Sequence, residues 1–162
     1  MSDEELIEAI ERANLGLEPP PFGELSISII GSPASVQSSK NVKNKYLGKI
    51  KNVLSQYKFV LTGQLTLDIT WLVPAKSRYE TDAKADIDNC LKPIIDAFTG
   101  PEGLFIDDCQ LKGLYICWRH IESGEESLNF DFKFDPVQWG NKENLAFIRI
   151  DNAMCIFVDT TW

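Results

Sequence analysis

The chain has 162 residues, of which 44% are hydrophobic, and its formal net charge is −8. This length and composition suit one domain with a hydrophobic core and short extensions. No apolar run approaches the roughly 20 residues that a membrane-spanning helix needs, and the N-terminus lacks a signal-peptide pattern, so we expect a cytoplasmic protein. The four cysteines form no CxxC pair and His120 is not spaced to them as a ligand, which argues against a zinc site.

The first third of the chain is predicted to contain two helices around one strand. Apolar side chains at helical spacing, with Ser2 as a possible N-cap, predict a helix over residues 3–15 that ends before a proline-rich spacer. A strand is expected over residues 25–30. A polar loop over 32–44 should lead to a second helix over 46–57, where lysines lie opposite the apolar face.

The middle of the chain has the clearest periodic patterns. Apolar residues alternate with polar ones over residues 65–73, which predicts a half-buried strand. After a polar loop, the spacing i, i+3, i+4, i+7 predicts a helix over 89–98. Pro93 should then lie in or near the first turn of that helix, where its missing N–H is tolerated.

The rest of the chain is predicted to be β-structure. Strands are expected over residues 104–106, 111–118 and 127–134, the last two joined as a hairpin through Ser123-Gly124-Glu125. Residues 145–158 suggest a further hairpin. The prediction is an α+β fold with a mostly antiparallel or mixed sheet and two principal helices. We expect three segments: an acidic helix and spacer at 1–22, the main domain at 23–135, and a C-terminal extension at 136–162.

Charge is distributed unevenly along this acidic chain. Net negative charge alone argues against a nucleic-acid partner. Between Leu25 and Leu67, however, there is no acidic residue and there are six lysines, while the acidic residues gather towards both ends. A basic segment in an acidic chain indicates a surface of one sign. A solvated, lysine-rich helix face would give the same pattern.

Carboxylates and one lysine gather within residues 86–108. Asp86 and Asp88 lie where a loop enters the predicted helix, Lys92 follows one turn later, and Asp107-Asp108 end an apolar triplet. Each has a simple structural explanation: a helix cap, an i, i+4 ion pair of about 0.3–0.5 kcal/mol, or a strand-to-turn junction. Together they suggest more, because close carboxylates repel unless a cation offsets their charge, and all-oxygen ligands favour Mg²⁺ or Mn²⁺. Lys92 would then be available for a phosphate.

These residues carry a family resemblance. Two stretches, Asp86 to Phe98 and Gly103 to Gln110, resemble the RusA family of Holliday junction resolvases, which are crossover junction endodeoxyribonucleases. The resemblance implies a RusA-like fold and catalytic residues Asp86, Asp88, Lys92 and Asp108. The three aspartates would be ligands of Mg²⁺, with Mn²⁺ as a substitute and Asp107 as a further candidate ligand. Asn89 would cap the helix, and Asp96 would pair with Lys92.

The same resemblance implies the substrate and the assembly. The family acts as a homodimer that makes paired cuts in a four-way DNA junction during recombination and repair, and two-fold symmetry suits a substrate with two equivalent strands. We expect DNA contacts from basic residues in the lysine-rich stretch of residues 40–58 and in the loop before Asp86. They are Lys40, Lys43, Lys45, Lys49, Lys76, Arg78 and Lys84.

Two other functions are consistent with the sequence. The acidic charge and the terminal extensions fit a RusA-like scaffold that binds protein or DNA without cutting it, with a possible protein partner at the acidic termini. A small-molecule phosphohydrolase would use the same metal site, but the chain lacks a glycine-rich phosphate loop. Steep salt dependence of binding to branched DNA would favour the nuclease, because it reports phosphate contacts.

Overall fold

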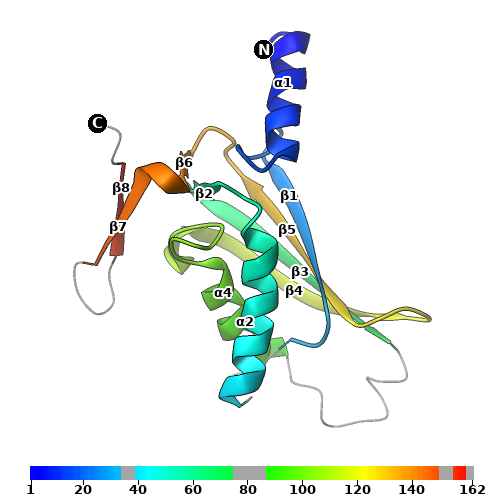
Figure 1. Ribbon diagram of the computed structural model, residues 1–162. Coiled ribbons are helices and arrows are strands. Elements are labelled where there is room, and N and C mark those ends of the chain that lie inside the picture. The colour runs from blue at the N-terminus through cyan, green and yellow to red at the C-terminus, as the bar shows by residue number, and fades with distance from the viewer. Residues whose placement is uncertain (34–38, 75–86, 150–154, 160–162) are drawn as a thin grey trace.

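A four-stranded mixed sheet forms the centre of the protein (Figure 1). The computed structural model describes residues 1–33, 39–74, 87–149 and 155–159. The strand order is β1 (Glu24–Ile30), β5 (Ser127–Phe134), β3 (Leu65–Pro74) and β4 (Leu111–Ile121). β5 is antiparallel to both of its neighbours, whereas β3 and β4 are parallel. The predicted α+β fold with a mixed sheet is confirmed.

β3 is the central strand of the hydrophobic core. Every second residue of β3 points to the same face, so the alternating sequence puts five large apolar side chains on one side. These side chains are no more than 1% exposed: Leu65, Leu67, Ile69, Trp71 and Val73. The strand predicted over residues 65–73 is therefore confirmed.

Two helices cover this face of the sheet and lie side by side in Figure 1, α2 (Lys40–Leu54) and α4 (Ile87–Phe98). α2 buries Tyr46, Ile50 and Leu54. The C-terminal end of α4 is held by Phe98, whose ring centroid lies 4.8 Å from that of Phe130 and 5.2 Å from that of Phe132. Tilted aromatic contacts of this kind add to the burial of apolar area, so the end of α4 is firmly attached to β5.

Both helices begin earlier than the sequence suggested. α2 starts at Lys40, because Ser39 Oγ accepts a hydrogen bond from the Val42 amide at 3.3 Å and caps a polar first turn. The polar loop expected over 32–44 is thus wrong from residue 40 onward. α4 starts at Ile87, so Pro93 is its seventh residue and lies in the second turn rather than in or near the first. A proline there removes one helical hydrogen bond.

The order of the strands corrects the predicted hairpin. β4 and β5 follow each other in the chain, but they do not pair, because β3 lies between them and binds both. The chain leaves β3, forms α4, and returns as β4 parallel to β3. Residues 104–106 also form no strand, since Phe105 makes only isolated bridges with Leu61 and Thr99.

Shorter elements surround the main sheet. β2 (Phe59–Leu61) pairs with β6 (Trp139–Asn141), and both were too short to predict from periodicity. Two 3-10 turns, η1 (Asp108–Gln110) and η2 (Lys142–Asn144), precede β4 and β7 (Leu145–Arg149). β7 and β8 (Cys155–Asp159) form the antiparallel hairpin predicted for residues 145–158.

The N-terminal helix α1 (Asp3–Asn14) projects beyond the start of β1 (Figure 1). Ser2 is its N-cap, as predicted: Ser2 Oγ accepts from the Glu5 amide at 3.2 Å, and a Glu5 carboxylate oxygen accepts from the Ser2 amide at 3.1 Å. Only Ala9 of this helix is buried, and Ile7 is 56% exposed, so its apolar stripe is only partly packed. None of the helices in the described part of the chain is long and apolar enough to cross a membrane.

Candidate active site

The first motif lies at the start of α4. Asp88 is the second residue of this helix, Lys92 lies one turn later and Asp96 one turn after that. Because residues four apart are neighbours on a helix surface, Lys92 lies between the two aspartates along α4. Asp86 lies outside the described residues, and the side chain of Asp88 is likewise not described. Their expected roles as metal ligands are therefore not tested by the structure.

The second motif returns to α4 through a tightly bonded loop. The Leu104 amide donates to the Phe98 carbonyl at 2.8 Å, and the Gly100 amide donates to the carbonyls of Phe105 and Ile106 at 3.1 and 3.2 Å. Gly100 has a φ of 98°, a conformation that favours glycine. The loop thereby folds back on the C-terminal end of α4 and carries Asp107 and Asp108 with it.

Asp107 and Asp108 strongly affect each other electrostatically. A hydrogen bond that protonated Asp108 donates to Asp107 is the main reason why the pKa of Asp108 is raised and that of Asp107 lowered. Burial and the negative charges of Asp107 and Asp96 raise the pKa of Asp108 further. Asp108 is thus repelled by two other carboxylates, and a bound cation would relieve that repulsion.

This donor chemistry fits a hard divalent ion, since every candidate ligand is a carboxylate. Among the residues whose side chains are described, no group of three histidine, cysteine, aspartate or glutamate side chains has the spacing of a metal site. Of the three aspartates expected as ligands, only Asp108 has a described side chain. Asp96 is the nearby carboxylate that the sequence prediction did not assign to the site. Asp96 lies eight residues after Asp88, and this spacing, about two helical turns, was the sequence signal that could have placed it near the site.

Lys92 is accessible and is paired as expected. Its Nζ lies 3.5 Å from Asp96 Oδ2, and the two side chains are 76% and 58% exposed. Lys92 and Asp96 also line a small cavity of about 130 Å³ together with Lys43 and Leu47 of α2. The ammonium group is therefore held next to the Asp96 carboxylate without being buried, and a phosphate could reach it from solvent.

The basic residues expected to bind DNA divide into three groups. Lys43 lies next to the candidate site, because it shares the cavity with Lys92 and Asp96. Lys40, Lys45 and Lys49 are exposed along α2, and Lys49 Nζ donates to the Ile30 carbonyl at 3.2 Å. The three expected in the preceding loop, Lys76, Arg78 and Lys84, lie outside the described residues.

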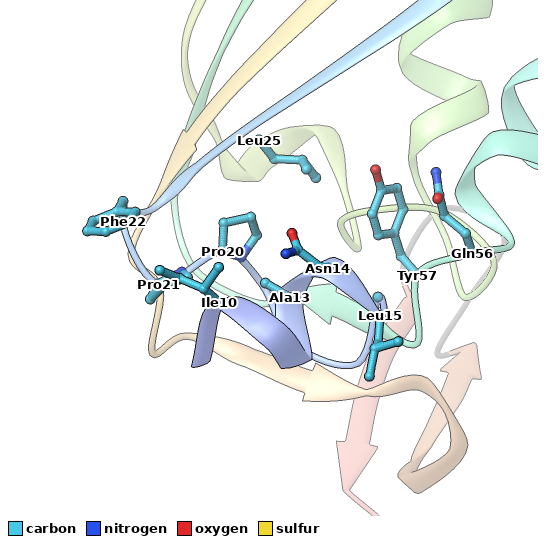
Figure 2. A pocket seen from close by; sticks show the side chains of 11 residues that line it. Ile10, Ala13, Asn14, Leu15, Pro20, Pro21, Phe22, Leu25, Gln56 and Tyr57 are labelled. Atoms are coloured by element: carbon cyan, nitrogen blue, oxygen red, sulfur yellow. The ribbon is translucent and has the colours of Figure 1, made fainter. Parts of the chain in front are cut away.

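A larger cavity lies elsewhere and has a different character. It lies between the end of α1 and the start of β1 (Figure 2). Its volume is about 380 Å³. Its lining is mainly apolar, including Ile10, Pro20, Phe22 and Leu25, and Tyr57 is its one ionisable side chain. Burial raises the pKa of Tyr57. This cavity therefore offers contact area rather than carboxylate or lysine chemistry.

Comparison with known proteins identifies the family of the chain. The family model described as Endodeoxyribonuclease RusA matches residues 31–126, a stretch that contains α2, β3, α4, the two aspartate motifs and β4. No curated protein shows a match to the chain. Nucleases of the RusA type generally depend on a divalent metal, and their resolvase activity implies a branched DNA substrate. Since the match covers more than half of the chain, the protein belongs to the RusA family of endodeoxyribonucleases, hydrolases that act on DNA phosphodiester bonds.

Proposed function

We propose that this protein is a Mg²⁺-dependent, structure-selective endonuclease that resolves Holliday junctions by paired phosphodiester hydrolysis. The observation that carries the proposal is the hydrogen-bonded loop that folds back on the end of α4, so that Asp107, and in addition Asp96 of α4, raise the pKa of Asp108. Two motifs that are separated in the sequence are thereby brought towards each other. Carboxylates brought together in this way are typical of sites that hold a hard cation.

Each residue has a defined role in this proposal. Asp86, Asp88 and Asp108 hold the metal, and Asp107, which accepts the hydrogen bond from Asp108, is a further candidate ligand. Bound Mg²⁺, or Mn²⁺ in its place, supplies an activated water and stabilises charge on the phosphate. Lys92 binds the scissile phosphate and stabilises the negative charge that develops in the transition state. Asp96 holds the Lys92 ammonium group in place until the substrate arrives.

The lysines of α2 provide the surface for DNA. Lys43 is close enough to the site to contact a phosphate next to the one that is cut, and Lys40, Lys45 and Lys49 continue the basic surface along the helix. Lys76, Arg78 and Lys84 are proposed to extend it. A protein that neutralises several phosphates loses affinity steeply with salt, so this surface can be measured.

The protein is proposed to act as a homodimer. β4 is an edge strand of the sheet, and its outer edge pairs with no strand in the described part of the chain. Three large side chains on β4 are exposed: Leu114 by 43%, Tyr115 by 62% and Trp118 by 36%. Pairing of β4 with β4 of a second copy would extend the sheet across a two-fold axis and cover these side chains. Light scattering of wild type and Trp118→Glu tests this, and an unchanged dimer in the variant would contradict β4 as the contact.

Cleavage of a labelled synthetic four-way junction tests the main proposal. Symmetric nicks are expected in Mg²⁺ and none in EDTA, and linear duplex of the same sequence should remain intact. Asp108→Asn should bind the junction and leave it uncut. A protein that binds the junction but never cuts it, in either Mg²⁺ or Mn²⁺, would support the alternative of a non-cleaving RusA-like binding module.

One observation favours a second function, the binding of a protein partner at the acidic N-terminal segment. The apolar cavity of Figure 2 lies against α1, whose exposed face carries Asp3, Glu4, Glu5, Glu8 and Glu11. A partner with an apolar side chain flanked by lysine or arginine would complement both features. Titration with a lysine- and leucine-rich model peptide is expected to show salt-sensitive binding that Phe22→Ser weakens. Equal binding of an acidic peptide would contradict the proposal.

A further inference from the structure

Gln110 is the last residue of η1, and its side chain makes four hydrogen bonds. The amide oxygen Oε1 accepts from the backbone amides of Ile106 at 2.8 Å and Asp107 at 3.0 Å. The amide nitrogen Nε2 donates to the carbonyls of Leu61 at 2.9 Å and Gly63 at 2.8 Å. A glutamine side chain has two acceptor sites and two donor hydrogens, so these bonds use its full capacity.

The four bonds join two parts of the protein that differ in exposure to solvent. Leu61 ends β2, a strand whose three side chains are no more than 1% exposed. Its amide also donates to the Leu104 carbonyl at 2.8 Å. On the other side, Ile106 and Asp107 are the two residues directly before Asp108, and both Asp107 and Asp108 are exposed. Gln110 therefore ties an exposed acidic turn to a buried strand.

The acidic turn needs such an attachment because repulsion between negative charges disfavours its conformation. The negative charges of Asp107 and Asp96 both act unfavourably on that of Asp108 in the absence of a cation. The backbone of η1 supplies little resistance, since a 3-10 turn of three residues is a short element with weak hydrogen bonds. The Gln110 side chain binds the peptide groups that lead into Asp108 and is itself bonded to the end of β2 and to Gly63.

We propose that Gln110 is a positioning residue that holds the Asp108 carboxylate where a divalent cation binds. This inference rests on the proposed function, because it assigns Asp108 to the metal. No other side chain can make the same four bonds. Glutamate lacks both donors and would face the carbonyls of Leu61 and Gly63, asparagine is one methylene shorter, and methionine has the length without the polar groups.

Metal binding by Gln110→Met is the test. Mn²⁺ affinity is measured by electron paramagnetic resonance on the purified chain, and the Mg²⁺ concentration for half-maximal junction cleavage is measured in parallel. Loss of a group that orients a metal ligand typically weakens metal binding about 10- to 100-fold. We expect a loss of that size in both measurements, with unchanged junction binding in EDTA.

Gln138→Met is the matched control. Gln138 lies near Gly63 too, but it is exposed and has no bond to the aspartate turn among the described contacts. Its replacement should leave the Mn²⁺ affinity within about twofold. A folded Gln110→Met protein that binds Mn²⁺ as the wild type does would overturn the inference. Wild-type protein that binds no Mn²⁺ and cuts no junction would overturn the proposed function, and the inference would fall with it.

Amide hydrogen exchange on the wild type tests the inference even if Gln110→Met does not fold. The Ile106 and Asp107 amides should exchange slowly, because both donate to Gln110 Oε1. If both amides exchange as freely as those of an unstructured loop, Gln110 does not hold this turn and the inference is wrong.

Discussion

The substitution Lys92→Met distinguishes a catalytic role of Lys92 from a role only as a partner in a surface ion pair. In Lys92→Met the bond to Asp96 is lost, but the two side chains are 76% and 58% exposed and four residues apart on one helix. Exposed pairs of this kind contribute about 0.3–0.5 kcal/mol. For a protein of this size about 1 kcal/mol shifts the melting temperature by roughly 2–4 °C, so the melting temperature should fall by less than about 2 °C.

Cleavage should respond far more strongly than stability. Removal of one group that stabilises transition-state charge typically lowers the rate by about 10²- to 10³-fold. The assay is single-turnover cleavage of a four-way junction at saturating protein, with melting followed by circular dichroism on the same samples. Lys133→Met is the control, because Lys133 is also an exposed lysine but lies on β5.

The outcome that refutes this reasoning is a cleavage rate within about fivefold of the wild type in a folded Lys92→Met protein, since a transition-state contact is worth about 10²-fold or more. Lys92 would then be only the partner of Asp96. A large fall in melting temperature together with slow cleavage would also count against it, because the loss would then come from the fold.

Three further predictions follow from the structure. Phe98→Ala removes a fully buried ring from its contacts with β5 and should lower the free energy of unfolding by about 3–5 kcal/mol, as measured by urea titration; a loss below about 1 kcal/mol would contradict the packing. Lys43→Ala should leave folding unchanged and reduce the slope of log affinity against log salt by about 0.9 if one phosphate contact is lost, whereas an identical slope means no contact. Burial lowers the pKa of Lys142 below its usual 10.5. At pH values just below 10.5, the unfolded chain therefore binds more protons than the folded chain, and the stability of the wild type rises with pH in that range. Any stability advantage of Lys142→Met at neutral pH should therefore shrink as the pH approaches 10.5.

The fold was predictable where one face of an element is buried. The alternation in β3 and the helical spacing in α4 both report burial directly, so both elements were found. The first turn of α2 is polar and therefore shows no apolar period, although Ser39 was available as a cap signal. The place of β3 between β4 and β5 could not be predicted, because it depends on which distant strands pair.

The site was predictable as a set of residues but not as an arrangement. Spacing along the chain singled out Lys92 and Asp108, and the pairing of Lys92 with Asp96 is confirmed. The proximity of Asp96 to Asp108 and the four bonds of Gln110 depend on how the 99–107 loop folds back, which no local pattern reports. The catalytic roles of Asp86, Asp88, Lys92 and Asp108 all stay predictions.

The continuous β3–α4–β4 segment has a consequence for how this protein can change. All the candidate catalytic residues lie between the end of β3 and the start of β4, within one stretch of chain. The segments on either side supply charge, extensions and contact surfaces. They can therefore gain acidic residues, lengthen or acquire new partners while the candidate catalytic residues stay unchanged. An overall charge of −8 is compatible with a DNA-cutting enzyme, because residues 25–67 carry six lysines and no acidic residue that could repel a phosphate.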